Sequence, residues 1–221
     1  VLINIVNFID GMDGLAASLG ALIAVLLGLV AQSSGQAGLA AACAALAGAL
    51  LGFLPHNLRT SRPASIFLGD SGSASVGFLL AALAIKEDWA EADPLVALAT
   101  PVLIFSVLIY DMIQTTVSRI ASGHVRSFRQ WIDYVGRDHI HHRFADLLGD
   151  PKRALALILA LALGLGLSAL GLRRGDGAMA FIFLVHGALV LLVVAVLERS
   201  AARAGTRHAP PSATARGRGE R

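Results

Sequence analysis

The most informative property of this sequence is how little charge it contains. Only 15% of its 221 residues are charged, whereas 56% are apolar, and the mean hydropathy is +0.70. Ordinary soluble domains carry about 25% charged residues. The uncharged residues are also contiguous, because residues 15–54 form a run of 40 without one Asp, Glu, Lys or Arg. This pattern excludes an ordinary soluble domain and predicts a membrane protein.

Two further absences concern disulfides and targeting. The chain has a single cysteine, Cys43, so no disulfide can form within it. No removable signal peptide is recognisable, and residues 1–5 resemble the end of an apolar helix instead. We therefore expect the sequence to begin partway through a longer membrane protein.

The apolar runs predict an all-α, polytopic integral membrane protein with about six transmembrane helices. Residues 15–54 would make roughly 60 Å of helix, twice the hydrocarbon thickness, so the turn-forming residues 32–36 must divide them into two helices. The other four spans are expected at residues 73–89, 94–117, 154–172 and 178–197. Residues 1–197 are thus one transmembrane domain, and residues 198–221, rich in Arg, Ala, Pro and Gly, are expected to be a disordered basic tail.

The distribution of basic residues orients these spans. We place residues 1–14 in the cytoplasm and let each predicted span cross to the other side of the membrane. Then 15 of the 18 Lys and Arg residues fall on the cytoplasmic side and 3 on the other. Such an excess is typical of cytoplasmic segments. The polar loops at residues 55–72 and 118–153 share this face, so we expect any site that they form to be cytoplasmic.

Four polar side chains recur every three residues at the start of the chain. They are Asn4, Asn7, Asp10 and Asp13. The first three can share one helical face, and the glycines that follow let the backbone approach a ligand. A binding site is one interpretation, since polar groups are costly beside an apolar helix. The alternative is a glycine-rich turn in which Asp13 caps the next helix.

A second motif places Asp70 between two glycines at the expected start of a membrane helix. One interpretation is a magnesium ligand, because Mg²⁺ takes one or two protein carboxylates and completes its shell with water and phosphate oxygens. The alternative is a helix N-cap formed by Asp70 or Ser71. The residues alone favour neither.

The third motif is a cluster of histidine and arginine in the loop at residues 118–153. Its members are Arg137, Asp138, His139, His141, His142 and Arg143. Phosphate binding is the favoured interpretation. Attraction to anionic lipid, helped by Arg119, Arg126 and Arg129, is the second. Zinc binding is the third, although no nearby cysteine completes a ligand set.

Some polar residues receive a structural interpretation. Asp111, near the cytoplasmic end of the fourth span, is a candidate site residue by its depth, but pairing with a basic residue such as Arg119 is favoured. His56 and Asn57 are interpreted as loop caps.

In this order, the motifs resemble the polyprenyl-phosphate N-acetylhexosamine-1-phosphate transferase family, glycosyltransferase family 4, which is similar to phospho-MurNAc-pentapeptide translocase. The resemblance rests on Asn4-x-x-Asn7-x-x-Asp10-Gly-x-Asp13-Gly-Leu-Ala, Phe67-Leu-Gly-Asp70-Ser-Gly-Ser73 and His139-Ile-His141-His142-Arg143, and covers roughly residues 1–171. The segment Leu54-Pro-His-Asn57 resembles the branch that initiates O-antigen synthesis.

The resemblance implies a membrane enzyme that initiates cell-envelope polysaccharide synthesis. It would transfer N-acetylhexosamine-1-phosphate from a UDP-sugar to polyprenyl (undecaprenyl) phosphate at the cytoplasmic face of the bacterial inner membrane. The implied cofactor is Mg²⁺, with Mn²⁺ as an alternative. Nucleic acid is not an implied partner, and a homodimer is compatible with the family.

The resemblance also implies roles for individual residues. Metal binding falls to Asp70 and Asn7, and binding of the UDP-sugar to Asn4, Asn7 and Asp13. The implied catalytic residues are Asp10, Asp70, His139, His141, His142 and Arg143.

One departure from the family is the absence of its early aspartate pair, since no Asp-Asp dipeptide occurs in this chain. We expect the pair in a missing N-terminal part and expect this chain alone not to catalyse transfer. The alternatives are a transporter fragment or a non-catalytic lipid-binding scaffold. A transporter would place its ionisable residues near the bilayer midplane, and a scaffold would not explain the Asn/Asp array.

Overall fold

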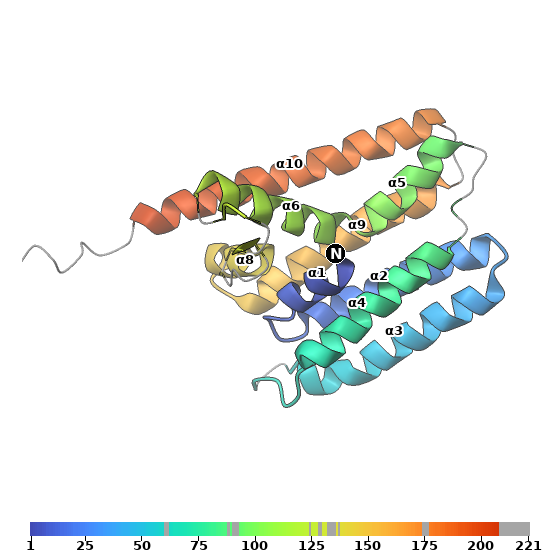
Figure 1. The fold of residues 1–221 in the computed structure, drawn as a ribbon, viewed down its shortest axis with the longest axis horizontal. Coiled ribbons are helices and arrows are strands. Elements are labelled where there is room, and N and C mark those ends of the chain that lie inside the picture. The colour runs from blue at the N-terminus through green and yellow to red at the C-terminus, as the bar shows by residue number, and fades with distance from the viewer. Residues whose placement is uncertain are drawn as a thin grey trace, which may run out of the picture.

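The computed structural model describes residues 1–59, 62–87, 89, 93–123, 125–127, 130–131, 136, 138–173 and 177–207. Over these ranges the chain is built from helices and loops and contains no strand, which confirms the predicted all-α fold (Figure 1). Four of these helices are long and apolar enough to cross a membrane, or five crossings if one bent pair counts as a span. The protein is therefore a multi-pass membrane protein.

The first part of the bundle is built around α2. A short helix, α1 (Leu2–Ile9), leads into α2 (Leu15–Ser33), which forms a hairpin with α3 (Ala37–Asn57). The predicted turn is confirmed, and Gly35 supplies its left-handed residue with a φ of 73°. Helix α2 is buried on nearly all sides because α3, α4 and α9 surround it, which explains its uniformly apolar sequence.

Helix α4 (Gly69–Lys86) packs against α1, and Gly77 makes this packing close. A Cβ atom on Gly77 would lie 2.7 Å from Cα of Ile3, so only glycine fits without displacing the backbone of α1. The close approach brings the second half of α1 beside the first turn of α4.

The polar start of α4 lowers its hydropathy, and α4 is not among the helices that are apolar enough to count as a membrane span. Length and hydropathy by themselves therefore support four or five of the roughly six predicted spans.

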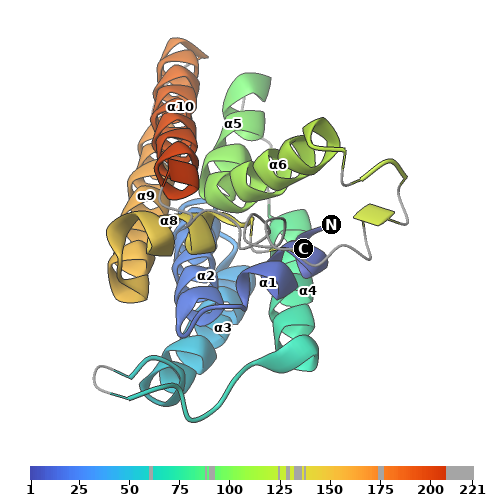
Figure 2. The same ribbon diagram turned by 90° about the vertical axis from the view of Figure 1, so that its left-hand side faces the viewer.

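The predicted straight span at residues 94–117 is corrected. The chain forms α5 (Pro94–Ile104) and α6 (Ser106–Ala121), bent by 73° at Phe105 (Figure 2). The Ser106 hydroxyl donates a hydrogen bond of 2.7 Å to the carbonyl of Leu103, and such back-bonding to a helix carbonyl favours a bend. The bend turns α6 away from the direction of α5.

The last three helices are α8 (Ile140–Leu148), α9 (Pro151–Leu172) and α10 (Gly177–Arg207). Helix α10 continues ten residues beyond the predicted span end, to Arg207. In this continuation Glu198 is buried and accepts a hydrogen bond from Tyr110 on α6. Residues 208–221 lie outside the described part of the chain.

Candidate active site

Three polar segments that are far apart in sequence meet at one end of the bundle. The loop at residues 10–14 lies beside the start of α4, since the backbone N–H of Gly69 donates to Asp10. The same loop lies against α8, because a Cβ atom on Gly11 would be 3.2 Å from Nε2 of His141. The segments singled out in the sequence therefore form one continuous polar region.

Asn7 joins α1 to the first turn of α4. Its Nδ2 donates to Oδ1 of Asp70 at 3.3 Å and to Oγ of Ser73 at 3.0 Å. Ser73 is buried, whereas Asp70 is exposed and faces solvent. Ser73 was not predicted as a site residue, although it belongs to the same sequence motif as Asp70 and could have been identified from it. These contacts bring the two predicted metal-binding residues together.

Asp10 adds a second carboxylate to this group. Burial raises the pKa of Asp10 to about 6, the Gly69 N–H opposes that rise, and the negative charge of Asp70 adds to it. Two neighbouring carboxylates that repel each other favour a bound cation. The residues thus fit Mg²⁺, which needs only one or two protein carboxylates, and Asp70, Asp10 and Asn7 would hold it.

The described residues give no support to three alternatives that the sequence had left open. The N-cap of α4 is Leu68, whose side chain accepts no hydrogen bond from the first turn, so neither Asp70 nor Ser71 is the N-cap of this helix. The N-cap of α2 is Gly14, with a φ of 79°, and Asp13 does not cap it. Within the described residues no group of three or more His, Cys, Asp and Glu side chains could hold a metal, so the zinc interpretation has no ligand set there.

The loop at residues 10–14 is held by the segment before α4. Asp13 accepts a 2.9 Å hydrogen bond from the Ala64 N–H through Oδ2. Asn57 accepts from the Gly14 N–H at 3.0 Å and donates to the Ile66 carbonyl at 3.0 Å. Asn57, interpreted as a simple loop cap, is therefore a buried bridge between two site loops. Asn4 is exposed, one turn before Asn7.

His139 is fixed by α6. Its Nδ1 lies 2.8 Å from Oδ2 of Asp111, and its Nε2 lies 3.3 Å from Nη2 of Arg119. Arginine can only donate, so Nε2 must accept and Nδ1 must carry the proton toward Asp111. Both ring nitrogens are thus engaged within the protein. This geometry fixes the orientation of the His139 ring.

The favoured structural pairing of Asp111 with a basic group of the following loop is confirmed, but the partner is His139 rather than Arg119. Asp111 binds His139 and also accepts a 2.7 Å hydrogen bond from the Ile140 N–H, so it anchors the start of α8. Arg119 instead forms two 2.7 Å hydrogen bonds to the carboxylate of Asp138. The sequence showed only that Asp111 was an ionisable group inside an apolar span, and the bend at Phe105 decides its partner.

The Arg119–Asp138 pair supports a prediction about stability. Burial by itself would raise the pKa of Asp138, but the hydrogen bonds and charge of Arg119 outweigh it and hold the pKa below its usual value. Replacing Asp138 with Asn should lower the free energy of unfolding by about 2–3 kcal/mol, because the buried guanidinium loses its ionic partner. Chemical unfolding in detergent micelles at neutral pH measures this difference.

The difference in free energy of unfolding between the wild type and Asp138→Asn should depend on pH, which tests its ionic origin. A carboxyl whose pKa is depressed on folding stabilises the fold above its unfolded pKa, about 3.9, and stops doing so as pH falls through the folded value. The gap between the wild type and Asp138→Asn should therefore persist at pH 5–8 and narrow below about pH 4. A gap that stays constant to pH 3 would contradict an ionic origin. Asp146→Asn, at an exposed position of α8, is the matched control.

The other two histidines lie next to the loop at residues 10–14. The rings of His141 and His142 are 4.1 Å apart, and those of His139 and His141 are 6.0 Å apart. His141 is buried, whereas His142 is partly exposed. His142 is thus the histidine of this motif with access to a ligand at the polar end of the bundle.

Arg143 follows on the same helix and approaches α10. Its Nη1 lies 3.6 Å from Oε2 of Glu198, and that oxygen also accepts a 2.9 Å hydrogen bond from the Tyr110 hydroxyl. Neither Tyr110 nor Glu198 was predicted as a site residue. Arg126 is exposed, whereas Arg129 and Arg137 lie outside the described residues.

Comparisons with known proteins agree with these motifs. Residues 1–87 match the model of glycosyl transferase family 4. The chain is 31% identical over 140 residues to a probable undecaprenyl-phosphate N-acetylglucosaminyl 1-phosphate transferase of Bacillus subtilis, covering 63% of this chain and 36% of that protein. It is 32% identical over 218 residues to a decaprenyl-phosphate N-acetylglucosaminephosphotransferase of Mycolicibacterium smegmatis, covering 90% and 52%.

A third relative is a phospho-N-acetylmuramoyl-pentapeptide-transferase of Enterococcus hirae, which is 41% identical over 88 residues, covering 39% of this chain and 26% of that protein. The chain spans about half or less of the length of these curated relatives.

Proposed function

We propose that the protein transfers N-acetylhexosamine-1-phosphate from a UDP-sugar to a polyprenyl phosphate, a proposal supported by the match of residues 1–87 to the model of glycosyl transferase family 4. The products are a lipid diphosphate sugar and UMP. The observation that carries the proposal is the meeting of Asn7, Asp10 and Asp70 with the His141–His142 segment at one end of a membrane helix bundle.

The site has the parts that phosphoryl transfer requires. An oxygen of the lipid phosphate attacks the phosphorus attached to the sugar, the bond from that phosphorus to the bridging oxygen breaks, and UMP leaves. Mg²⁺, when bound, would neutralise charge on the two phosphorylated reactants. Asp70, Asp10 and Asn7 would hold it, and His142 and Arg143 donate hydrogen bonds to phosphate oxygens. The lipid phosphate is already anionic, so the attack needs no strong general base.

The proposed setting is the cytoplasmic face of the bacterial inner membrane, where the reaction starts an envelope polysaccharide such as O-antigen. Two of the relatives carry both a polyprenyl phosphate and N-acetylglucosamine in their names. The excess of Lys and Arg on the side of the polar segments supports the orientation.

Product analysis tests the function directly. Membranes containing the full-length gene product are supplied with labelled UDP-N-acetylglucosamine and undecaprenyl phosphate, with Mg²⁺ or with a chelator. We expect a labelled lipid product and an equal amount of UMP, both dependent on the metal. Release of UMP without a lipid product, or no reaction with any UDP-N-acetylhexosamine, would reject the proposal.

Replacing Asp13 with Ala should weaken binding of UMP and of the UDP-sugar by about tenfold, the loss expected for one charge-assisted hydrogen bond. The proposed role is acceptance of a hydrogen bond from the uracil ring by the carboxylate, whose Oδ2 also holds the Ala64 N–H. Calorimetric titration with UMP measures the change. Ser65→Ala, which removes a hydrogen bond from the same loop without touching Asp13, is the control. Equal losses in both variants would mean that loop order, not Asp13, sets the affinity.

A further inference from the structure

A buried carboxylate on α10 lies behind the His/Arg segment of α8. The side chain of Glu198 is 1% exposed, although glutamate is rarely buried without a partner. Glu198 lies beyond residues 1–87, the part that matches the family model, and beyond the motifs recognised in the sequence. A buried carboxylate of this kind needs a partner that stabilises its negative charge.

The partners of Glu198 come from two other helices. Tyr110 on α6 donates to Oε2 of Glu198 at 2.9 Å, and Nη1 of Arg143 on α8 lies 3.6 Å from the same oxygen. The Tyr110 bond fixes where the carboxylate points. The Arg143 distance is that of an ion pair rather than of a tight hydrogen bond, and a guanidinium has five N–H donors. Glu198 can therefore orient Arg143 without occupying the donors that a phosphate would need.

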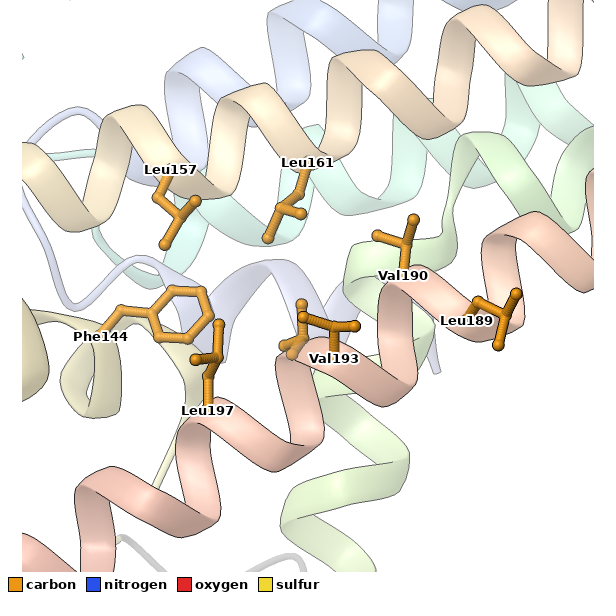
Figure 3. Close-up of a pocket in the computed structure, with 8 residues that line it drawn as sticks. Phe144, Leu157, Leu161, Leu189, Val190, Val193 and Leu197 are labelled. Atoms are coloured by element: carbon orange, nitrogen blue, oxygen red, sulfur yellow. The ribbon is translucent and has the colours of Figure 1, made fainter.

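Apolar side chains of the same two helices lie beside this pair. Phe144 and Leu197, the chain neighbours of Arg143 and Glu198, line the same apolar cavity of about 370 Å³ between α8, α9 and α10. Figure 3 shows the ring of Phe144 beside Leu197, with Val193 one turn farther along α10. The ionic contact thus lies at the edge of an apolar contact between the same two helices.

We propose that Glu198 is a positioning residue for the transfer reaction, which acts by holding Arg143 and, through α8, the neighbouring His142 in the orientation that meets the phosphates. This inference rests on the proposed function. It extends the active site to α10, although the side chain of Glu198 itself touches no substrate. Tyr110 assists by fixing the carboxylate.

A double-mutant cycle on turnover separates positioning from mere structural support. Glu198→Gln keeps the shape of the side chain but removes the charge, and should lower kcat by about tenfold or more with little change in KM for the UDP-sugar. Glu198→Asp, which restores the charge, should recover part of the loss. In an Arg143→Ala background, Glu198→Gln should change kcat by less than about twofold, because its target is gone.

Glu87→Gln is the matched control, since Glu87 is also buried and hydrogen-bonded but lies at the far end of α4. It should leave kcat unchanged. Losses for Glu198→Gln that multiply with those of Arg143→Ala, or a loss as large for Glu87→Gln, would overturn the positioning role.

Hydrogen exchange provides a readout that does not depend on transfer. Amides of residues 140–148 should exchange faster in Glu198→Gln than in the wild type or in Glu87→Gln, because α8 loses its ionic anchor. Unchanged exchange there would overturn the inference even if turnover fell. A wild type that transfers no sugar phosphate would refute the proposed function instead, and exchange would then decide whether Glu198 holds the segment.

Discussion

Replacing Asp70 with Asn should reduce sugar-phosphate transfer at least about 1000-fold, and magnesium should no longer stimulate the residual rate. The side chain is exposed, receives a hydrogen bond from Asn7 and repels Asp10, so it contributes charge rather than packing. An amide of the same shape removes the charge that a metal requires and leaves the fold intact. Transfer to undecaprenyl phosphate at several magnesium concentrations, in the full-length gene product, measures both effects.

Asp146→Asn is the control for this substitution, because it makes the same chemical change at an exposed carboxylate of α8. It should retain the wild-type rate, and both variants should have the thermal unfolding profile of the wild type. Wild-type turnover by Asp70→Asn at ordinary magnesium concentrations would remove Asp70 from the metal site.

His142→Ala and Arg143→Ala should each lower turnover roughly 30- to 1000-fold, the loss expected when a charge-assisted hydrogen bond to a transition-state phosphate oxygen disappears. The two residues follow one another on α8, beside the loop at residues 10–14. Steady-state transfer rates measure the losses, and membrane insertion should be unaffected.

Arg126→Ala separates this interpretation from attraction to anionic lipid. Arg126 is exposed and belongs to the same predicted loop, so a lipid-binding surface would use it as readily as Arg143. Such a surface predicts similar, small losses at all three positions, each around 1 kcal/mol per charge and weaker in high salt. A phosphate site predicts large losses at His142 and Arg143 and almost none at Arg126. Equal salt-sensitive losses would take α8 out of the active site.

Long apolar runs made the helical membrane fold predictable, but not the course of each span. Length required a hairpin, because one helix of 40 residues cannot fit one bilayer, and the turn-forming residues 32–36 gave its position. The bend at Phe105 could not be predicted in this way, since the residues around it are as apolar as those of a straight span. At the bend, Ser106 donates a hydrogen bond to the Leu103 carbonyl, a contact that favours bending and that hydropathy does not record.

By itself, the sequence determined which residues are candidates for chemistry, because polar groups in an apolar chain are costly and therefore conspicuous. Only the tertiary structure decided their partners. It paired Asp111 with His139 rather than with Arg119, and it buried Glu198 beside Arg143. These choices depend on crossing angles and distances between helices that are remote in sequence. A residue's spacing along its own helix specifies the face it occupies, but not the side chain that meets it from another helix.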